Sequence, residues 1–157
     1  MKSHFIVLVL VALCIGSNTL NAQSSNDNEI SLNHIGLYVS DLKKSTTFYE
    51  DIVHLRQIPE LFHDGKHTWF TIGAAGHLHL IEGAAHEITR DKNDHLCFSV
   101  RSIEEFISNL DQHGIGYTNW AGTAKEPTVR VDGVKQIYFK DPDNHLIEIN
   151  NDRSVTK

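Results

Sequence analysis

The chain has 157 residues, with 14 lysines and arginines against 20 aspartates and glutamates, and its formal net charge is −6. An acidic surface of this kind repels a phosphate backbone, so we expect no nucleic acid among its partners. Without the amino-terminal segment described next, about 130 residues remain, which is enough for one domain with a hydrophobic core.

Residues 1–22 have the features of a cleavable secretory signal. Lys2 supplies a positive charge, residues 5–15 are apolar, and Ala22 is a small residue at the predicted cleavage point. A bilayer span needs about 20 apolar residues, so this short apolar run argues against a membrane anchor. We therefore expect cleavage after Ala22, a secreted or periplasmic location and no membrane contact afterwards. An uncleaved anchor and a lipid on Cys14 remain the alternatives.

Cleavage would remove Lys2 and no acidic residue, so the net charge of the mature chain would be 13 − 20 = −7. Residues 23–31 are expected to form a linker, and the folded domain is expected over residues 32–152. Cys97 would be the one cysteine left, which excludes a disulfide within a single chain.

The rest of the chain predicts two successive modules, each with a strand, a helix and three further strands. For the first module we expect a strand at 33–39, a helix at 41–53 and strands at 55–58, 67–72 and 77–81. For the second we expect a strand at 94–100, a helix at 102–113 and strands at 117–120, 134–139 and 145–149. Residues 121–130 lack periodicity and are expected to form a loop. The predicted fold class is therefore α+β, with two βαβββ modules that form a curved sheet around a metal-binding cavity.

The two modules match when one is shifted along the other by 61 places. This shift puts His34 on His95, and the closing strands of the two modules carry His79 and Glu148 at comparable depths. An ancient duplication is the simplest explanation of the match.

Strand alternation predicts that these four side chains lie on the sheet faces that no helix covers. In residues 33–39 the apolar side chains alternate with His34, so the histidine lies on the opposite face from them. The same alternation holds around His79, His95 and Glu148. We therefore expect these four residues to bind one divalent metal ion, because three imidazoles and a carboxylate suit Zn, Ni, Fe, Mn or Co. The alternative for each histidine taken alone is a polar residue at a sheet edge.

The motifs of the chain resemble those of the vicinal oxygen chelate superfamily, which contains glyoxalase I, methylmalonyl-CoA epimerase, extradiol dioxygenases and fosfomycin-resistance thiol transferases. The resemblance covers about residues 32–151. It rests on the His-Ile and His-Leu pairs that open strands, the helix signature at 41–49, and residues 137–144 before the closing strand. It implies the same βαβββ repeat. Members commonly assemble as dimers, sometimes building each cavity from two chains, so a homodimer is one expectation.

From the signal segment we expect export, and from this resemblance we expect a divalent-metal-dependent enzyme of glyoxalase type. It would be an isomerase or lyase that acts on a small oxygenated substrate through a metal-stabilised enediolate, with Glu148 as the catalytic base. Glyoxalase I usually has a glutamate at the place of His79. An extradiol-type dioxygenase or a fosfomycin-type thiol transferase, each using His34, His95 and Glu148, remains an alternative. A non-enzymatic small-molecule binding protein is the alternative of another class.

Four further residues are candidates for contact with the substrate: Tyr38, Trp69, Arg130 and Lys135. Tyr38 shares the predicted face of His34, and the other three are expected to reach a carboxylated substrate. Packing or solvated roles are the alternative for all four. His67 and His145 are expected at the surface.

Overall fold

The computed structural model describes residues 30–73, 76–85 and 89–153. The predicted signal segment, residues 1–22, lies outside them. Residues 32–157 belong to one compact unit. Within the described ranges, no helix has the length and apolar character needed to cross a membrane.

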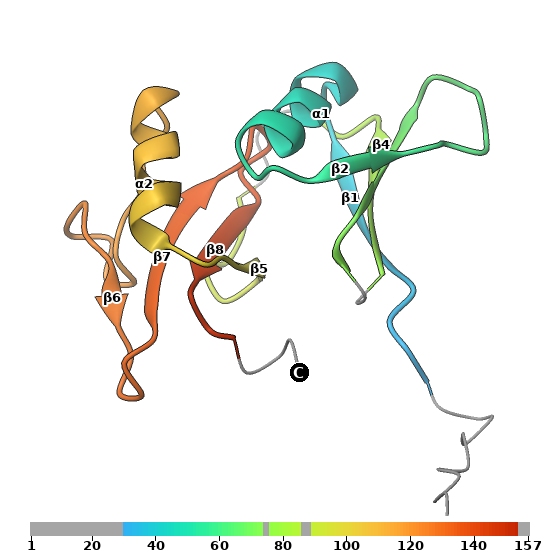
Figure 1. Cartoon of the computed structure of the whole chain (residues 1–157). Helices are drawn as coiled ribbons and strands as arrows, with labels where there is room; N and C mark the ends of the chain where they lie inside the picture. The colour runs from blue at the N-terminus through green and yellow to red at the C-terminus, as the bar shows by residue number, and fades with distance from the viewer. Residues whose placement is uncertain (1–29, 74–75, 86–88, 154–157) are drawn as a thin grey trace, which may run out of the picture. The chain divides into compact units, whose positions relative to one another are not determined.

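The described chain contains two modules of the same design (Figure 1). The first comprises β1 (His34–Val39), α1 (Leu42–Asp51), β2 (Arg56–Ile58), β3 (His67–Thr71) and β4 (His77–Glu82). The second comprises β5 (His95–Ser99), α2 (Ile103–Gln112), β6 (Thr128–Val129), β7 (Lys135–Lys140) and β8 (Leu146–Asn150). Each module has its own four-stranded sheet, in the order β1-β4-β3-β2 and β5-β8-β7-β6. The predicted α+β fold of two βαβββ modules is confirmed, although the two sheets do not close into one.

One predicted strand is wrong. Residues 117–120 make only an isolated bridge, in which Thr118 and Tyr138 exchange two backbone hydrogen bonds of 2.8 and 2.9 Å. A turn then directs the chain away from the sheet, because the backbone N–H of Gly122 donates to the carbonyl of Asn119. The edge strand is instead β6, inside the segment that was expected to be a loop.

Both helices begin at a residue that caps them. The side chain of Asp41 accepts a hydrogen bond from the backbone N–H of Lys44, and Ser102 does the same for Glu105. Such caps satisfy N–H groups that the first helical turn leaves without partners. They fix where each helix starts, and with that the face that it turns to the sheet.

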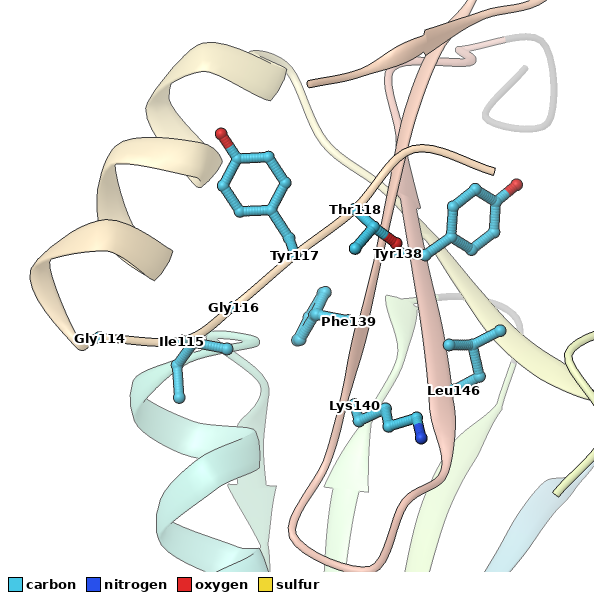
Figure 2. A pocket seen from close by; sticks show the side chains of 9 residues that line it. All are labelled: Gly114, Ile115, Gly116, Tyr117, Thr118, Tyr138, Phe139, Lys140 and Leu146. Atoms are coloured by element: carbon cyan, nitrogen blue, oxygen red, sulfur yellow. The ribbon is translucent and has the colours of Figure 1, made fainter. Parts of the chain in front are cut away.

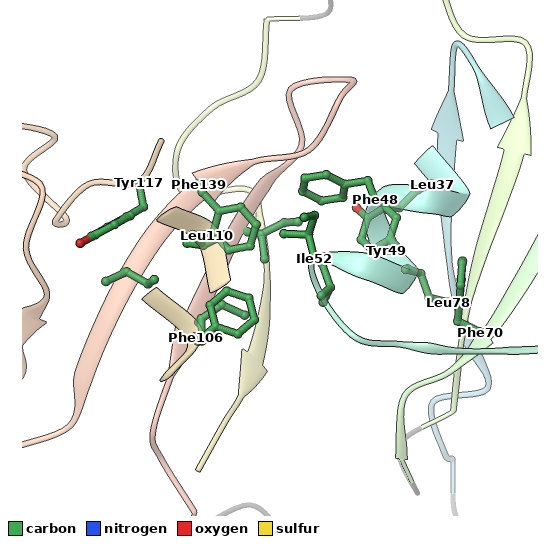
Figure 3. Packing of buried hydrophobic residues seen from close by; sticks show 14 of the residues in the cluster. Leu37, Phe48, Tyr49, Ile52, Phe70, Leu78, Phe106, Leu110, Tyr117 and Phe139 are labelled. Atoms are coloured by element: carbon green, nitrogen blue, oxygen red, sulfur yellow. The ribbon is translucent and has the colours of Figure 1, made fainter. Parts of the chain in front are cut away.

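The hydrophobic core includes the helix-facing side chains of both modules (Figure 3). Phe139 of β7 contacts Phe48 of α1 and Phe106 of α2, with ring centroids 6.1 and 5.8 Å apart. Leu78 and Leu80, which flank His79 along β4, are fully buried. The apolar faces of the strands are therefore occupied by core packing, as alternation predicts.

A buried turn between β7 and β8 connects the two modules through hydrogen bonds. Asp141 accepts hydrogen bonds from the backbone of His145 and from the hydroxyl of Tyr49 on α1, at 2.7 and 3.0 Å. Asp143 accepts from the backbone of Ser40 and from the hydroxyl of Ser45, at 2.9 and 3.1 Å. The acidic turn of the second module thereby holds the start of the helix of the first.

The same turn corrects one sequence prediction. His145 is buried, and its Nδ1 lies 2.8 Å from Oδ2 of Asp141, so its predicted surface position is wrong.

Candidate metal centre

β1 and β4 bring His34 and His79 together on one face of the first sheet. These strands are parallel neighbours, and Gly36 pairs with His79, so His34 lies two places before the residue opposite His79. The two imidazole centroids are 5.9 Å apart. Two imidazoles on one ion, with metal–nitrogen bonds of about 2.1 Å, have centroids at most about 6.4 Å apart. His34 and His79, the first half-site, are thus close enough to share an ion.

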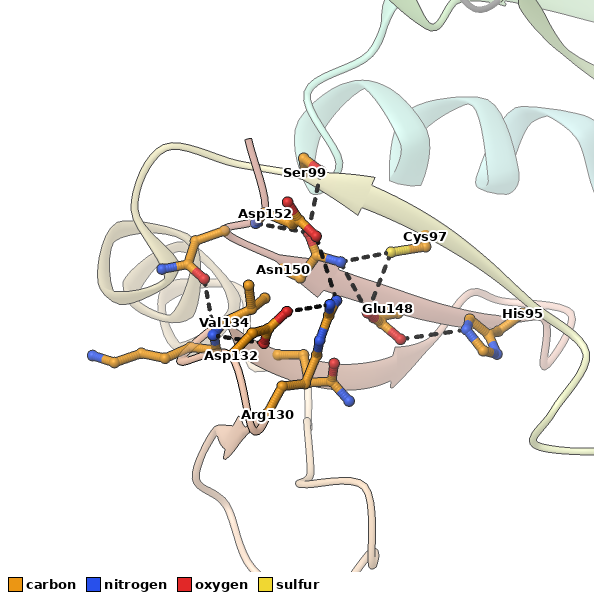
Figure 4. Close-up of polar contacts among 12 residues, drawn as sticks. His95, Cys97, Ser99, Arg130, Asp132, Val134, Glu148, Asn150 and Asp152 are labelled. Carbon is orange, nitrogen blue, oxygen red and sulfur yellow. Dashed lines mark hydrogen bonds and ion pairs between the residues drawn. The ribbon is translucent and has the colours of Figure 1, made fainter. Parts of the chain in front are cut away.

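β5 and β8 bring His95 and Glu148 together in the same way (Figure 4). Cys97 pairs with Glu148, so His95 again lies two places before the residue opposite its partner. Nε2 of His95 is 3.3 Å from Oε2 of Glu148. Two donors bound at right angles, each about 2.1 Å from an ion, would be about 3.0 Å apart. His95 and Glu148, the second half-site, also have a spacing that fits two ligands of one ion.

The two half-sites obey one strand register, since Gly36 and Cys97 are 61 places apart and hold equivalent positions. Among the described residues, however, no group of three or more His, Cys, Asp or Glu side chains is placed to hold a metal ion. The chain therefore brings the four predicted ligands together as two pairs.

Aromatic neighbours hold the first half-site. His79 is buried and stacks on Trp69, with centroids 3.9 Å apart and planes inclined by 15°. Its Nε2 is hydrogen-bonded to Nδ1 of His67 at 2.7 Å. His67 is therefore part of this site, and its predicted surface role is wrong. Burial, and then the neighbouring His67 and His34, lower the pKa of His79 and favour the neutral form that can bind a metal.

Hydrogen-bond donors hold the second half-site. Glu148 accepts from the hydroxyl of Tyr138 at 2.7 Å, from the side-chain amide of Asn150 at 3.0 Å and from the thiol of Cys97 at 3.3 Å. Burial alone would raise the pKa of Glu148, but these donors and the nearby His95 outweigh it and lower the pKa. Glu148 is thus held as a carboxylate.

Cys97 acts in this network as a donor. It is exposed, yet partial desolvation, together with the charge and the hydrogen bond of Glu148, raises the pKa of its thiol to about 12. A thiol with this pKa stays protonated at neutral pH and is a poor nucleophile.

The amino-acid sequence of this site and the fold around it match a known family. Residues 31–149 match the sequence model of the Glyoxalase/Bleomycin resistance protein/Dioxygenase superfamily. The chain belongs to this superfamily. The resemblance noted from its motifs is therefore confirmed.

Several relatives in the superfamily carry names from fosfomycin resistance. The chain is 30% identical over 124 residues to the fosfomycin resistance protein FosX of Listeria monocytogenes, covering 75% of this chain and 86% of the relative. It is 30% identical over 129 residues to the metallothiol transferase FosB of Staphylococcus epidermidis, covering 76% and 80%.

One solved structure similar to this chain contains a metal ion and a small molecule. It is a glutamate-to-glutamine variant of the Listeria monocytogenes FosX in complex with Mn(II) and 1S,2S-dihydroxypropylphosphonic acid. Its TM-score to this chain is 0.62 at 28% identity, with 79% of this chain and 91% of that chain covered.

The four candidate substrate residues lie at different positions relative to the two half-sites. Tyr38 is exposed on the His34 face of β1, and Trp69 contacts both histidines of the first half-site. Arg130 lies beside the second half-site, paired with Asp132 (Figure 4). Lys135 instead binds Glu104 of α2 at 2.6 Å, on the helix-covered side of its sheet. The structure thus does not bring Lys135 to the Glu148 face.

Several residues near the second half-site, including Asn150, Tyr138, Trp120 and Lys92, were not found from the sequence. Tyr138 pairs with Glu148 across β7 and β8, and Trp120 lies 5.3 Å from its ring. Nζ of Lys92 lies 4.4 Å from the centroid of Trp120. Strand alternation along β7 could have predicted that Tyr138 lies on the Glu148 face. Lys92 and Trp120 lie in irregular segments, where no such pattern exists.

A pocket of 420 Å³ lies along the edge of β7 and beside the segment that follows α2 (Figure 2). Its walls include Tyr117, Phe139, Leu146 and also Tyr138, which donates to Glu148 of the second half-site. None of the four predicted metal ligands lines it. We therefore assign the chemistry to the half-sites, where the donors are paired, and not to this pocket.

The hydrogen bond from Tyr138 predicts how Glu148 titrates. In Tyr138→Phe, the carboxylate loses a donor that favours its charged form, so the pKa of Glu148 should rise. Because the folded-state pKa of Glu148 is lowered, ionised Glu148 stabilises the fold at pH values above its unfolded-state pKa. This stabilisation is lost as the pH falls through the folded-state pKa, and it should be smaller in Tyr138→Phe. Carbon-detected NMR titration of metal-free protein measures this. Tyr117→Phe is the control, and an unchanged Glu148 titration in Tyr138→Phe would contradict the assignment.

Proposed function

We propose that the chain is a divalent-metal-dependent enzyme whose metal site combines the first half-site of one copy with the second half-site of another. The observation that carries this is the presence of two ligand pairs, each with metal-compatible spacing, that a single chain holds apart. The donor set joins neutral imidazoles to one carboxylate, which suits a divalent transition ion. The matching register of the half-sites supports their symmetrical use.

The residues of the chain would prepare such a site before an ion binds. Glu148 is held ionised by its donors, and Trp69 holds the ring plane of His79. A bound divalent ion would supply Lewis acidity to two adjacent oxygens of a small substrate. Arg130 and Lys92 lie on the Glu148 side. Lys92 would supply positive charge for an acidic group on that substrate, and Arg130 would do so by exchanging its ion pairs with Asp132 and Asp152.

Subunit complementation tests the two-chain site. One variant carries His34→Ala with His79→Ala, and the other carries His95→Ala with Glu148→Ala. Each alone should bind almost no metal. After unfolding and refolding together, random pairing makes half of the dimers mixed, each with one complete site, so about a quarter of the wild-type metal should return. Metal analysis after gel filtration measures the outcome.

A site closed within one chain predicts a different result. Every chain in the mixture would then lack half of its ligands, and no metal would return. That result, with full metal in the refolded wild-type control, would overturn the two-chain proposal.

Two reactions are candidates for this site. A glyoxalase-type isomerase or lyase is favoured by the buried His79, which gives a fourth donor where glyoxalase I has a glutamate. It requires a base, and Glu148 is the carboxylate available. The lowered pKa of Glu148 makes it a weak proton acceptor, which disfavours this reaction.

A fosfomycin-type addition of water or a thiol is favoured by the 30% identity to both FosX and FosB. The product-like diol in the FosX structure places two neighbouring hydroxyls beside a phosphonate. A similar substrate would offer two oxygens to the ion and an acidic group to Arg130. This addition needs Glu148 only as a permanent anionic ligand, which agrees with its hydrogen bonds.

A substrate panel with Glu148→Gln distinguishes the two reactions. We expect the Mn(II)-loaded enzyme to open fosfomycin with water or a thiol, and to act poorly on a hemithioacetal. In an enzyme that uses Glu148 as its base, Glu148→Gln would lower kcat by about a hundredfold or more while metal remains bound. Product formation is followed by phosphorus NMR and by absorbance.

Hemithioacetal turnover that disappears in Glu148→Gln would instead favour the isomerase. Tight metal binding without turnover of either substrate, or of a catechol, would favour a binding protein.

We also propose that the chain is exported, on the strength of residues 1–22. When the full chain is expressed in a host with two membranes, the periplasmic fraction should contain a protein whose amino terminus is near Gln23. Mass spectrometry of each fraction measures this, with a chain starting at Gln23 as the cytoplasmic control. An intact Met1 in the cytoplasm would overturn the proposal.

A further inference from the structure

Three polar side chains form a chain of contacts that ends at a predicted metal ligand. Oδ2 of Asp64 lies 3.4 Å from Nε2 of His67, and Nδ1 of His67 lies 2.7 Å from Nε2 of His79. His67 and His79 lie on the adjacent strands β3 and β4. The order of contacts is therefore carboxylate, histidine, histidine.

The chemistry of these groups restricts where the protons lie. The negative charge of Asp64, 3.4 Å from Nε2 of His67, favours a proton on that nitrogen. Neutral His67 then has its lone pair on Nδ1, and His79 must donate from Nε2. In the reverse arrangement His67 donates, and the lone pair of Nε2 of His79 is already used. In both arrangements Nε2 of His79 has no free lone pair for a metal ion.

We propose that His79 binds its metal ion through Nδ1, with His67 and Asp64 as positioning residues that fix its tautomer. This inference rests on the metal site given above as the proposed function. A metal-binding histidine usually donates its other ring N–H to a neighbouring acceptor. Here His67 provides that acceptor, and Asp64 orients His67.

The sheet order supports the choice of nitrogen. β4 lies between β3, which carries His67, and β1, which carries His34. Nε2 of His79 is engaged by the histidine of β3, and the two ring nitrogens lie on different edges of the ring. Within the described part of the chain, Nδ1 of His79 makes no hydrogen bond. It is the nitrogen left for an ion shared with His34.

Aromatic contacts keep the two rings in this arrangement. His79 stacks on Trp69, and Phe62 covers His67 with ring centroids 4.8 Å apart. The stack on Trp69 fixes the plane of the His79 ring, and the hydrogen bond to His67 determines which edge of that ring faces His67. The orientation of His79 is thus set by packing as well as by hydrogen bonds.

The first test measures the tautomer without any metal. Long-range nitrogen–proton NMR of the metal-free protein, at a pH where His79 is neutral, should show the proton on Nε2 and a bare Nδ1. In His67→Phe, which keeps a ring under Phe62 but removes the acceptor, this preference should weaken. A wild-type His79 with its proton on Nδ1 would overturn the proposal.

The second test measures metal affinity by competition with a chromophoric chelator, using Zn(II). His67→Phe should weaken binding by about 10- to 100-fold, as expected when the acceptor behind a metal-binding histidine is lost. His67→Asn puts an acceptor oxygen close to the position of Nδ1 and should stay within about threefold of wild type. His113→Phe, at the end of α2, is the control and should bind as wild type.

The outcomes separate this inference from the proposed function. If wild type binds Zn(II) and His67→Phe binds equally well, the positioning role is wrong and the metal site stands. If His67→Asn loses as much affinity as His67→Phe, the ring itself matters and the acceptor role is wrong. If wild type binds no metal, the proposed function fails, and the nitrogen assignment fails with it.

Discussion

The acidic turn between β7 and β8 is the contact on which the arrangement of the two modules depends. Asp141 and Asp143 are buried carboxylates, and each accepts hydrogen bonds from the start or the interior of α1. Removing one partner of such a group leaves a buried charge without compensation, which is strongly unfavourable. The turn therefore determines which faces of the two modules pack together. The packed faces are the helix-covered ones, and the opposite faces of the two sheets carry the predicted ligands.

An ancient duplication would explain why the predicted ligands occur as pairs. In each module, the residue two places after the histidine of the first strand lies opposite the predicted ligand of the closing strand. This register places the two polar side chains on the same face. The two copies have since diverged in charge. The first holds His34 and a buried His79 among aromatic rings, whereas the second holds His95 and a carboxylate among hydrogen-bond donors. A site that combines both half-sites would place one negative charge among neutral donors. This combination favours a divalent ion over a monovalent one.

Period-two alternation made most of the fold, and the faces of all four predicted ligands, accessible from the sequence. It failed where structure depends on distant partners. The bridge at Thr118 exists only because Tyr138 lies opposite, and the turn after Asn119 ends it at once. His145 and His67 resemble surface histidines in the sequence. In the structure, His145 is buried against Asp141, and His67 is hydrogen-bonded to His79. No local sequence pattern predicts such pairings, because a polar side chain is buried only where a distant group supplies its hydrogen bond.

Both half-sites are ordered within the single chain, and this has an energetic consequence for the proposed assembly. A site built from flexible side chains would lose rotamer entropy when metal and second subunit arrive, typically about 0.5–1.5 kcal/mol for each side chain immobilised. Here stacking on Trp69 and hydrogen bonding to Tyr138 have already restricted His79 and Glu148. The restriction is provided by each module's own fold, so it is present in a chain that has no partner. Formation of the complete site would then depend mainly on bringing two rigid surfaces together, which is why the separation of the pairs within one chain is compatible with a metal-dependent function.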